Sequence, residues 1–145
     1  LEFQDALIFD SRRNIEEATG ANFFAFENKT TIVTPPLDQY ILPGITRATS
    51  IEIARNLGFT VREENISIAC LSNMKAAYLT GTATGHCPIR VIYDPTTNAV
   101  YHFDNKFGPF LELQKEFDNL IDGEDVHPKN RDLQQRARAM AVPLN

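Results

Sequence analysis

The chain has 145 residues, of which 43% are hydrophobic and 23% charged, and such a composition can bury one globular core. Fourteen lysines and arginines against nineteen aspartates and glutamates leave a formal net charge of −5, which argues against a nucleic-acid-binding protein with a basic face. No apolar run approaches the roughly 20 residues that span a bilayer, and two cysteines cannot build a disulfide framework. We therefore expect one soluble, cytoplasmic domain with neither a membrane nor a nucleic-acid partner.

The first half of the chain alternates apolar segments with polar turns. Apolar and β-branched composition predicts strands at 6–10, 21–26, 30–34 and 59–66, the last of them at an edge. The second and third of these strands form a hairpin around Asn28-Lys29. Apolar residues recur at helical spacing from about Thr46 to Leu57, and Gly58 suits the position just after a helix end, so a helix is expected there.

The second half of the chain continues the alternation of helices and strands. Ser67 is expected to cap a short helix in which Cys70 is a core thiol. Composition predicts strands at 76–80, 88–93 and 99–103. A closing helix follows, with one apolar face marked by Phe110, Leu113, Phe117, Leu120 and Ile121. The polar tail beyond Gly123 is expected to fray, and the interleaved pattern predicts an α/β or α+β domain.

Two glycine-containing segments have the features of an anion site. In Leu42-Pro43-Gly44-Ile45-Thr46-Arg47 a glycine turn leads directly into the predicted helix, whose first amides lack intrahelical partners. In Gly81-Thr82-Ala83-Thr84-Gly85 small residues at a strand end let a ligand approach the backbone. Neither segment is a P-loop or a dinucleotide fingerprint, so two ordinary turns remain the alternative interpretation.

Among the carboxylates, the pair Glu16-Glu17 stands apart from the solvated acidic residues elsewhere. It lies between the first predicted strand and the apolar hairpin, and one of the two side chains should point inward. A buried carboxylate needs a cationic partner or a protonated ring nitrogen. The adjacent His86-Cys87 pair lacks the spacing of metal ligands, so no metal site is expected.

Together these residues resemble the class IV (fold type IV) pyridoxal-phosphate-dependent aminotransferases. The likeness is carried, in chain order, by Glu17-Ala18-Thr19-Gly20-Ala21-Asn22-Phe23-Phe24, Thr34-Pro35-Pro36-Leu37, Ile41-Leu42-Pro43-Gly44-Ile45-Thr46-Arg47 and Leu79-Thr80-Gly81-Thr82-Ala83. It corresponds to the large, carboxy-terminal domain of that family. The resemblance implies an α/β fold with a mixed β-sheet or open pseudo-barrel and flanking helices. Residues 1–123 would form this domain, and 124–145 a polar tail.

The resemblance also implies roles for individual residues around pyridoxal 5′-phosphate. Glu17 would pair with the protonated pyridine nitrogen and keep the ring an electron sink. The cofactor phosphate would be bound by Gly44, Ile45, Thr46 and Thr82. The backbone amides of Ala83 and Thr84 would face the substrate carboxylate. The implied reaction transfers an amino group from an amino acid, of the branched-chain or D-amino-acid type, to a 2-oxo acid, and relatives of this family are usually homodimers.

Several features depart from the family pattern, and one is that the sequence has no counterpart of the family's small amino-terminal domain. The family's Schiff-base lysine lies on a strand farther upstream than the sixteen residues that precede Glu17, and no lysine of this chain matches its position. Gly85-His86 departs from the commoner run after Gly-Thr-Ala. We therefore expect this chain to be part of a longer transaminase and inactive alone. Two alternatives are a lyase similar to aminodeoxychorismate lyase and a truncated, non-catalytic homologue that acts as a binding module.

Overall fold

The computed structural model of the chain describes residues 2–38 and 40–140. The strands of this part are β1 (Leu7–Phe9), β2 (Asn14–Ala18), β3 (Asn22–Phe26), β4 (Thr31–Thr34), β5 (Thr60–Glu63), β6 (Ile66–Ser67), β7 (Ala76–Gly81), β8 (Gly85–Ile89), β9 (Val91–Asp94) and β10 (Ala99–His102). The α-helices are α1 (Ile45–Asn56), α2 (Gly108–Asp122) and α3 (Arg131–Met140), and the short 3-10 helices are η1 (Ile68–Asn73) and η2 (Pro128–Asn130). No helix in the described ranges is both long and apolar enough to cross a membrane.

Strand β3 lies at the centre of the main sheet. It pairs antiparallel with β4 on one side and with β7 on the other, and β8 continues the sheet beyond β7. The other edge is β5, which runs parallel to β4 because α1 connects the two as a crossover. Strands β1, β2 and β6 continue from this sheet, whereas β9 and β10 form a separate hairpin. The architecture is thus the expected mixed sheet with flanking helices.

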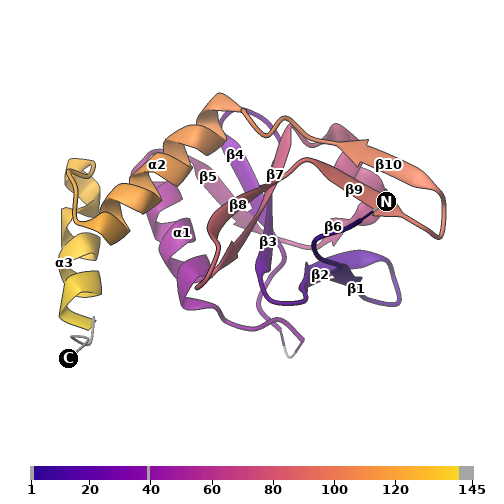
Figure 1. Ribbon diagram of the computed structural model, residues 1–145, viewed down its shortest axis with the longest axis horizontal. Helices are drawn as coiled ribbons and strands as arrows, with labels where there is room; N and C mark the ends of the chain where they lie inside the picture. The colour runs from indigo at the N-terminus through magenta and orange to yellow at the C-terminus, as the bar shows by residue number, and fades with distance from the viewer. Residues whose placement is uncertain (1, 39, 141–145) are drawn as a thin grey trace.

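Both faces of the central sheet are covered, as Figure 1 shows. Phe24 and Phe26 project from β3 toward the helices and pack with residues of α1 and α2. Phe23 and Ala25 project from the opposite face and pack against β2, β6, η1 and the β9–β10 hairpin. All five residues of β3 are therefore buried. This explains why its sequence is continuously apolar after Asn22. A strand with one solvent-exposed face would alternate apolar and polar residues.

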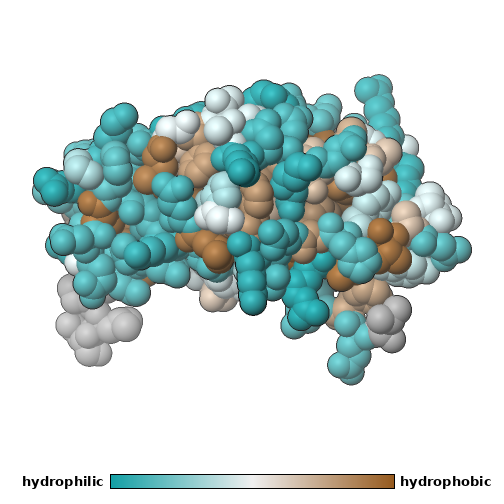
Figure 2. Space-filling view, turned by 90° about the horizontal axis from the view of Figure 1, so that it is seen from above, coloured by the Kyte–Doolittle hydropathy of each residue, from teal (hydrophilic) through white to brown (hydrophobic). Residues whose placement is uncertain are grey.

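The outer surface matches the acidic, polar composition of the chain. On the face seen in Figure 2, hydrophilic side chains predominate and apolar ones are scattered between them. The best exposed apolar side chains of the described residues, Ile45 and Leu42, flank the start of α1, with exposures of 77% and 70%. The start of α1, which belongs to a predicted anion site, is therefore open to solvent.

Most predicted elements are present, but the structure corrects the predicted strand at 88–93. The chain leaves β7 after Ile89 and pairs with β10 from Val91, so two strands, β8 and β9, replace one. Both stretches are apolar, and composition cannot reveal a change of pairing partner. Strand β2 was not expected, because Glu16-Glu17 interrupts its apolar pattern.

Two burial predictions and the prediction for the tail were also wrong. Cys70 is exposed, because η1 has about three residues per turn and only Ile68 and Leu71 reach the core. Ile121 is 60% exposed, because it lies one position beyond the buried face of α2. The tail does not fray from Gly123: it forms η2 and α3, and Leu133 of α3 joins the core against the helices. Residues 141–145 of the predicted tail lie outside the described ranges.

Candidate functional site

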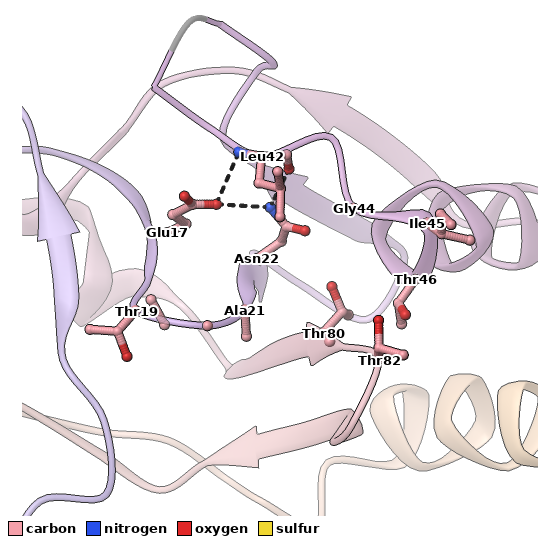
Figure 3. A pocket seen from close by; sticks show the side chains of 13 residues that line it. Glu17, Thr19, Ala21, Asn22, Leu42, Gly44, Ile45, Thr46, Thr80 and Thr82 are labelled. Atoms are coloured by element: carbon pink, nitrogen blue, oxygen red, sulfur yellow. Dashed lines mark hydrogen bonds between the residues drawn. The ribbon is translucent and has the colours of Figure 1, made fainter.

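A pocket of about 130 Å³ lies where four segments of the chain meet (Figure 3). These segments are the end of β2 with its turn into β3, the loop before α1, the first turn of α1, and the end of β7 with its turn into β8. The lining residues are Glu17, Ala18, Thr19, Gly20, Ala21, Asn22, Leu42, Gly44, Ile45, Thr46, Thr80, Gly81 and Thr82. The two anion-site segments, which are far apart in the sequence, thus line one pocket.

The first turn of α1 presents free amides to this pocket. Gly44 is the N-cap, with extended backbone angles, and no side chain caps the helix. The amides of Ile45 and Thr46 therefore lack the intrahelical partners that later amides have, and the helix dipole adds positive potential there. Because Ile45 and Thr46 line the pocket, an anionic group in it would meet these donors directly.

Arg47, the third residue of α1, points away from the pocket. Its side chain is buried, and one guanidinium nitrogen donates to the Pro35 carbonyl at 3.0 Å and to the Glu63 carboxylate at 2.8 Å. The pocket lining contains no lysine or arginine. An anion bound there would therefore be held by backbone amides and hydroxyl groups.

Glu17 supplies the negative charge of the site. It pairs with Asn22 across β2 and β3, and its Oε2 accepts from Asn22 Nδ2 and from the Leu42 amide, both at 3.2 Å. Asn22 Nδ2 also donates to the Leu42 carbonyl at 3.0 Å, and Figure 3 shows these three residues converging. Glu17 is half-buried, and no salt bridge in residues 2–38 and 40–140 involves it. Its charge is thus free to pair with a cationic ligand.

The turn between β7 and β8 provides hydroxyl groups. Thr82 lines the pocket and is exposed to solvent. Ala83 and Thr84 are exposed in the same turn but do not line the pocket, so their assignment to a substrate carboxylate stays a prediction. Thr80 does line it, and its buried hydroxyl has no hydrogen-bond partner among the described residues.

Asn22 and Thr80 are two polar lining residues to which the sequence assigned no role. Each is a polar residue at the end of an otherwise apolar, buried strand, and this is the signal that could have revealed them. Neither could be assigned to the pocket from the sequence, because they meet only through the pairing of Asn22 in β3 with Thr80 in β7.

The described residues hold neither a metal site nor a lysine at the pocket. No group of three or more potential metal-ligating side chains occurs within them. All five lysines are exposed, and none of them lines the pocket: Lys29, Lys75, Lys106, Lys115 and Lys129. The pocket therefore offers an anion site and a carboxylate, but no amine of this chain.

Comparison with known proteins agrees with this geometry. Residues 1–92 match the family model described as amino-transferase class IV. The chain belongs to this family. The match includes every residue of the pocket, and three of the four segments that carry the family likeness line it, the exception being residues 34–37.

Individual relatives of this class IV chain are branched-chain aminotransferases. A "Probable branched-chain-amino-acid aminotransferase" of Rickettsia felis is 42% identical over 83 residues, which cover 57% of this chain and 28% of that protein. The "Branched-chain-amino-acid aminotransferase 1, mitochondrial" of Arabidopsis thaliana is 39% identical over 101 residues, which cover 68% of this chain and 26% of that protein. The chain thus spans well under half the length of these relatives.

A solved structure gives the same result for the fold. The branched-chain amino acid aminotransferase from Thermobaculum terrenum in its PLP form superposes with a TM-score of 0.72 at 26% identity. The superposition covers 83% of this chain and 38% of that chain. The central sheet and its helices are therefore those of a fold type IV enzyme.

Proposed function

We propose that this chain forms the cofactor-binding part of a pyridoxal-phosphate-dependent branched-chain-amino-acid aminotransferase. The observation that carries the proposal is the convergence of Glu17, the first turn of α1 and Thr82 on one pocket. Family membership supports the cofactor class, and the names of the relatives support the branched-chain substrates. Because the relatives are longer, the activity is proposed for the whole protein that contains this chain.

The pocket has the donors that a phosphate ester requires. The amides of Ile45 and Thr46, which Gly44 leaves open to approach, would hold the phosphate together with the hydroxyl groups of Thr46 and Thr82. The buried, unpartnered hydroxyl of Thr80 next to them indicates that the site is polar and unsatisfied without a ligand. The donor set therefore fits a phosphate group, although it contains no basic side chain.

Glu17 is suited to the other end of the cofactor. Pyridoxal phosphate, when bound, supplies a ring that draws electrons away from the substrate α-carbon. Glu17 would hold a proton on the pyridine nitrogen, because an ionised carboxylate stabilises the adjacent protonated nitrogen. Asn22 and the Leu42 amide fix the carboxylate through Oε2. Glu17 is thus oriented before the cofactor binds.

The proposal also covers the extent of the domain, the covalent lysine, the oligomeric state and the location of the protein. We propose that residues 1–123 correspond to the large carboxy-terminal domain of the family and that α3 is an addition packed against it. The lysine that binds the cofactor covalently would not be one of the five in this chain. The homodimer, the cytoplasmic location and the contact of Ala83 and Thr84 with the substrate carboxylate stay predictions.

The test is amino transfer by the complete natural protein. With leucine, isoleucine or valine and a 2-oxo acid, we expect formation of the corresponding amino acid that depends on added pyridoxal 5′-phosphate. Faster reaction with D-amino acids would contradict the branched-chain assignment. Release of pyruvate from aminodeoxychorismate, without an amino acceptor, would indicate the lyase. Cofactor binding without either reaction would indicate the non-catalytic binding module.

A further inference from the structure

Ser50 and His86 form a buried hydrogen bond that the proposed function does not use. The Oγ of Ser50 on α1 lies 2.7 Å from Nε2 of His86 on β8, and the two side chains are 0% and 4% exposed. They are 36 residues apart in the sequence. Neither lines the pocket. The bond therefore connects two elements behind the site without contacting what the site would hold.

The surroundings of His86 leave Ser50 as the polar partner of its ring. Tyr78 stacks on the ring at 5.5 Å between ring centroids, and Phe117 packs against it at 4.4 Å. The second ring nitrogen, Nδ1, has no partner among the described residues. Burial lowers the pKa of His86 to about 4, so the ring is neutral near pH 7. The interaction is thus a hydrogen bond between neutral groups and not an ion pair.

The two residues are placed directly behind the two halves of the proposed phosphate site. Ser50 follows Thr46 by four residues, one turn along α1. His86 lies opposite Thr80 in the β7–β8 pairing, and the turn that carries Thr82 is formed by the few residues between them. The Gln114 side chain also donates to the His86 carbonyl at 2.9 Å, which fixes β8 to α2. His86, at the base of the Thr82 turn, is thereby bonded to α1 through Ser50 and to α2 through Gln114.

We propose that Ser50 and His86 are positioning residues that set the distance between the amides at the start of α1 and the Thr82 hydroxyl group. This inference rests on the proposed function, because it takes the group bound between them to be a phosphate ester. Thr82 is exposed in a turn that begins after Gly81 and ends at Gly85, which has a φ of +58°. A turn of this kind has little packing of its own to hold Thr82 in place.

The test separates positioning from stability with two ligands that differ only in the phosphate. Pyridoxamine 5′-phosphate and pyridoxamine carry no aldehyde, so neither bonds covalently to a lysine. The dissociation constant of pyridoxamine divided by that of pyridoxamine 5′-phosphate is measured by calorimetry on the complete protein. This ratio reports the phosphate contacts alone, and it falls when those contacts weaken. Ser50→Ala breaks the hydrogen bond and leaves His86 unpaired. The double variant Ser50→Ala/His86→Phe replaces both groups by apolar ones, which restores most of the stability that the single change loses.

The matched control is Thr34→Val, because the Thr34 hydroxyl is also 0% exposed and donates to the Phe23 carbonyl at 2.7 Å, away from the pocket lining. We expect the ratio to fall about tenfold, or about 1.4 kcal/mol, in Ser50→Ala and in the double variant, and to stay unchanged in Thr34→Val. We expect the double variant to fold even if Ser50→Ala does not, because it leaves neither group of the bond unpaired. An unchanged ratio in the double variant would overturn the positioning role. A natural protein that binds both ligands equally would overturn the proposed phosphate site itself.

Discussion

The carboxamide of Asn22 occupies the space that a side chain at residue 44 would need. A Cβ atom placed on Gly44 would lie 2.5 Å from Asn22 Oδ1, closer than any real Cβ contact. The same carboxamide donates to Glu17 and to the Leu42 carbonyl through Nδ2. The glycine at the start of α1 therefore serves two purposes, because it opens the helix amides and gives room to the residue that fixes Glu17.

We predict that Gly44→Ala displaces the Asn22 side chain. The variant should lose about 1–3 kcal/mol of unfolding free energy, the typical cost of overpacking and of broken buried hydrogen bonds. Its affinity for pyridoxamine 5′-phosphate should fall as well. Urea unfolding and calorimetry measure the two effects. Gly108→Ala is the control, because a Cβ there meets no atom within 4 Å. Equal behaviour of the two variants would contradict the role assigned to Asn22.

Glu17→Gln in the complete protein should keep cofactor binding and lose turnover. A neutral amide cannot hold a proton on the pyridine nitrogen, so we expect kcat to fall on the order of 10²-fold, the scale of a well-placed acid or base. Steady-state kinetics and a cofactor titration measure the two quantities. Glu16→Gln is the matched control, since the neighbouring strand position faces the other side of β2 and does not line the pocket. A larger loss in Glu16→Gln would assign the role to Glu16 instead.

The chain of 145 residues should form no specific covalent bond with pyridoxal phosphate. All five of its lysines are exposed, and none lines the pocket, so no amine is placed beside the site of the phosphate. Borohydride reduction after incubation with the cofactor, followed by peptide mapping, should give only scattered labelling. No transaminase activity is expected from this chain alone. Stoichiometric labelling of a single lysine would contradict both expectations.

His86 should make the fold sensitive to acid. Its pKa is 6.5 in an unfolded chain and about 4 in the folded one, where burial disfavours the charged ring. The unfolded state therefore binds more protons between these values, and stability falls as the pH decreases from 6.5 toward 4. The loss is at most about 1.4 kcal/mol per pH unit, on the order of 3 kcal/mol in total. Above pH 6.5 the contribution of His86 is constant.

Urea unfolding of the natural chain and of His86→Phe, at pH values of about 7, 6 and 5, isolates this effect. Carboxylates that titrate in the same range contribute equally to both proteins and cancel in the difference. The gap in stability should therefore shift in favour of His86→Phe as the pH decreases. A gap that does not change with pH would show that His86 titrates normally and is not buried as described.

The sequence by itself determined the local elements and the family. Hydrophobic runs and helical spacing located β3, β4, α1, β7 and α2. Each pattern shows only that one segment is buried, and it is the same whichever neighbour that segment packs against. The glycines before α1 and after β7 were recognisable, since a helix start with free amides and a turn of small residues are properties of a few consecutive residues. The order of these motifs along the chain sufficed to indicate the family, as the match of residues 1–92 confirms.

Only the tertiary structure decided which of these residues meet. Thr46 and Thr82 line one pocket because β3 pairs with β7 and α1 packs on the same sheet. The local pattern could not separate Glu17 from Glu16, because neighbouring carboxylates have the same local signal, and only the family resemblance favoured Glu17. The pairing of β2 decides that Glu17 lines the pocket. Nor could it join Ser50 to His86, since a hydrogen bond across 36 residues depends on distances in space, which local patterns do not encode.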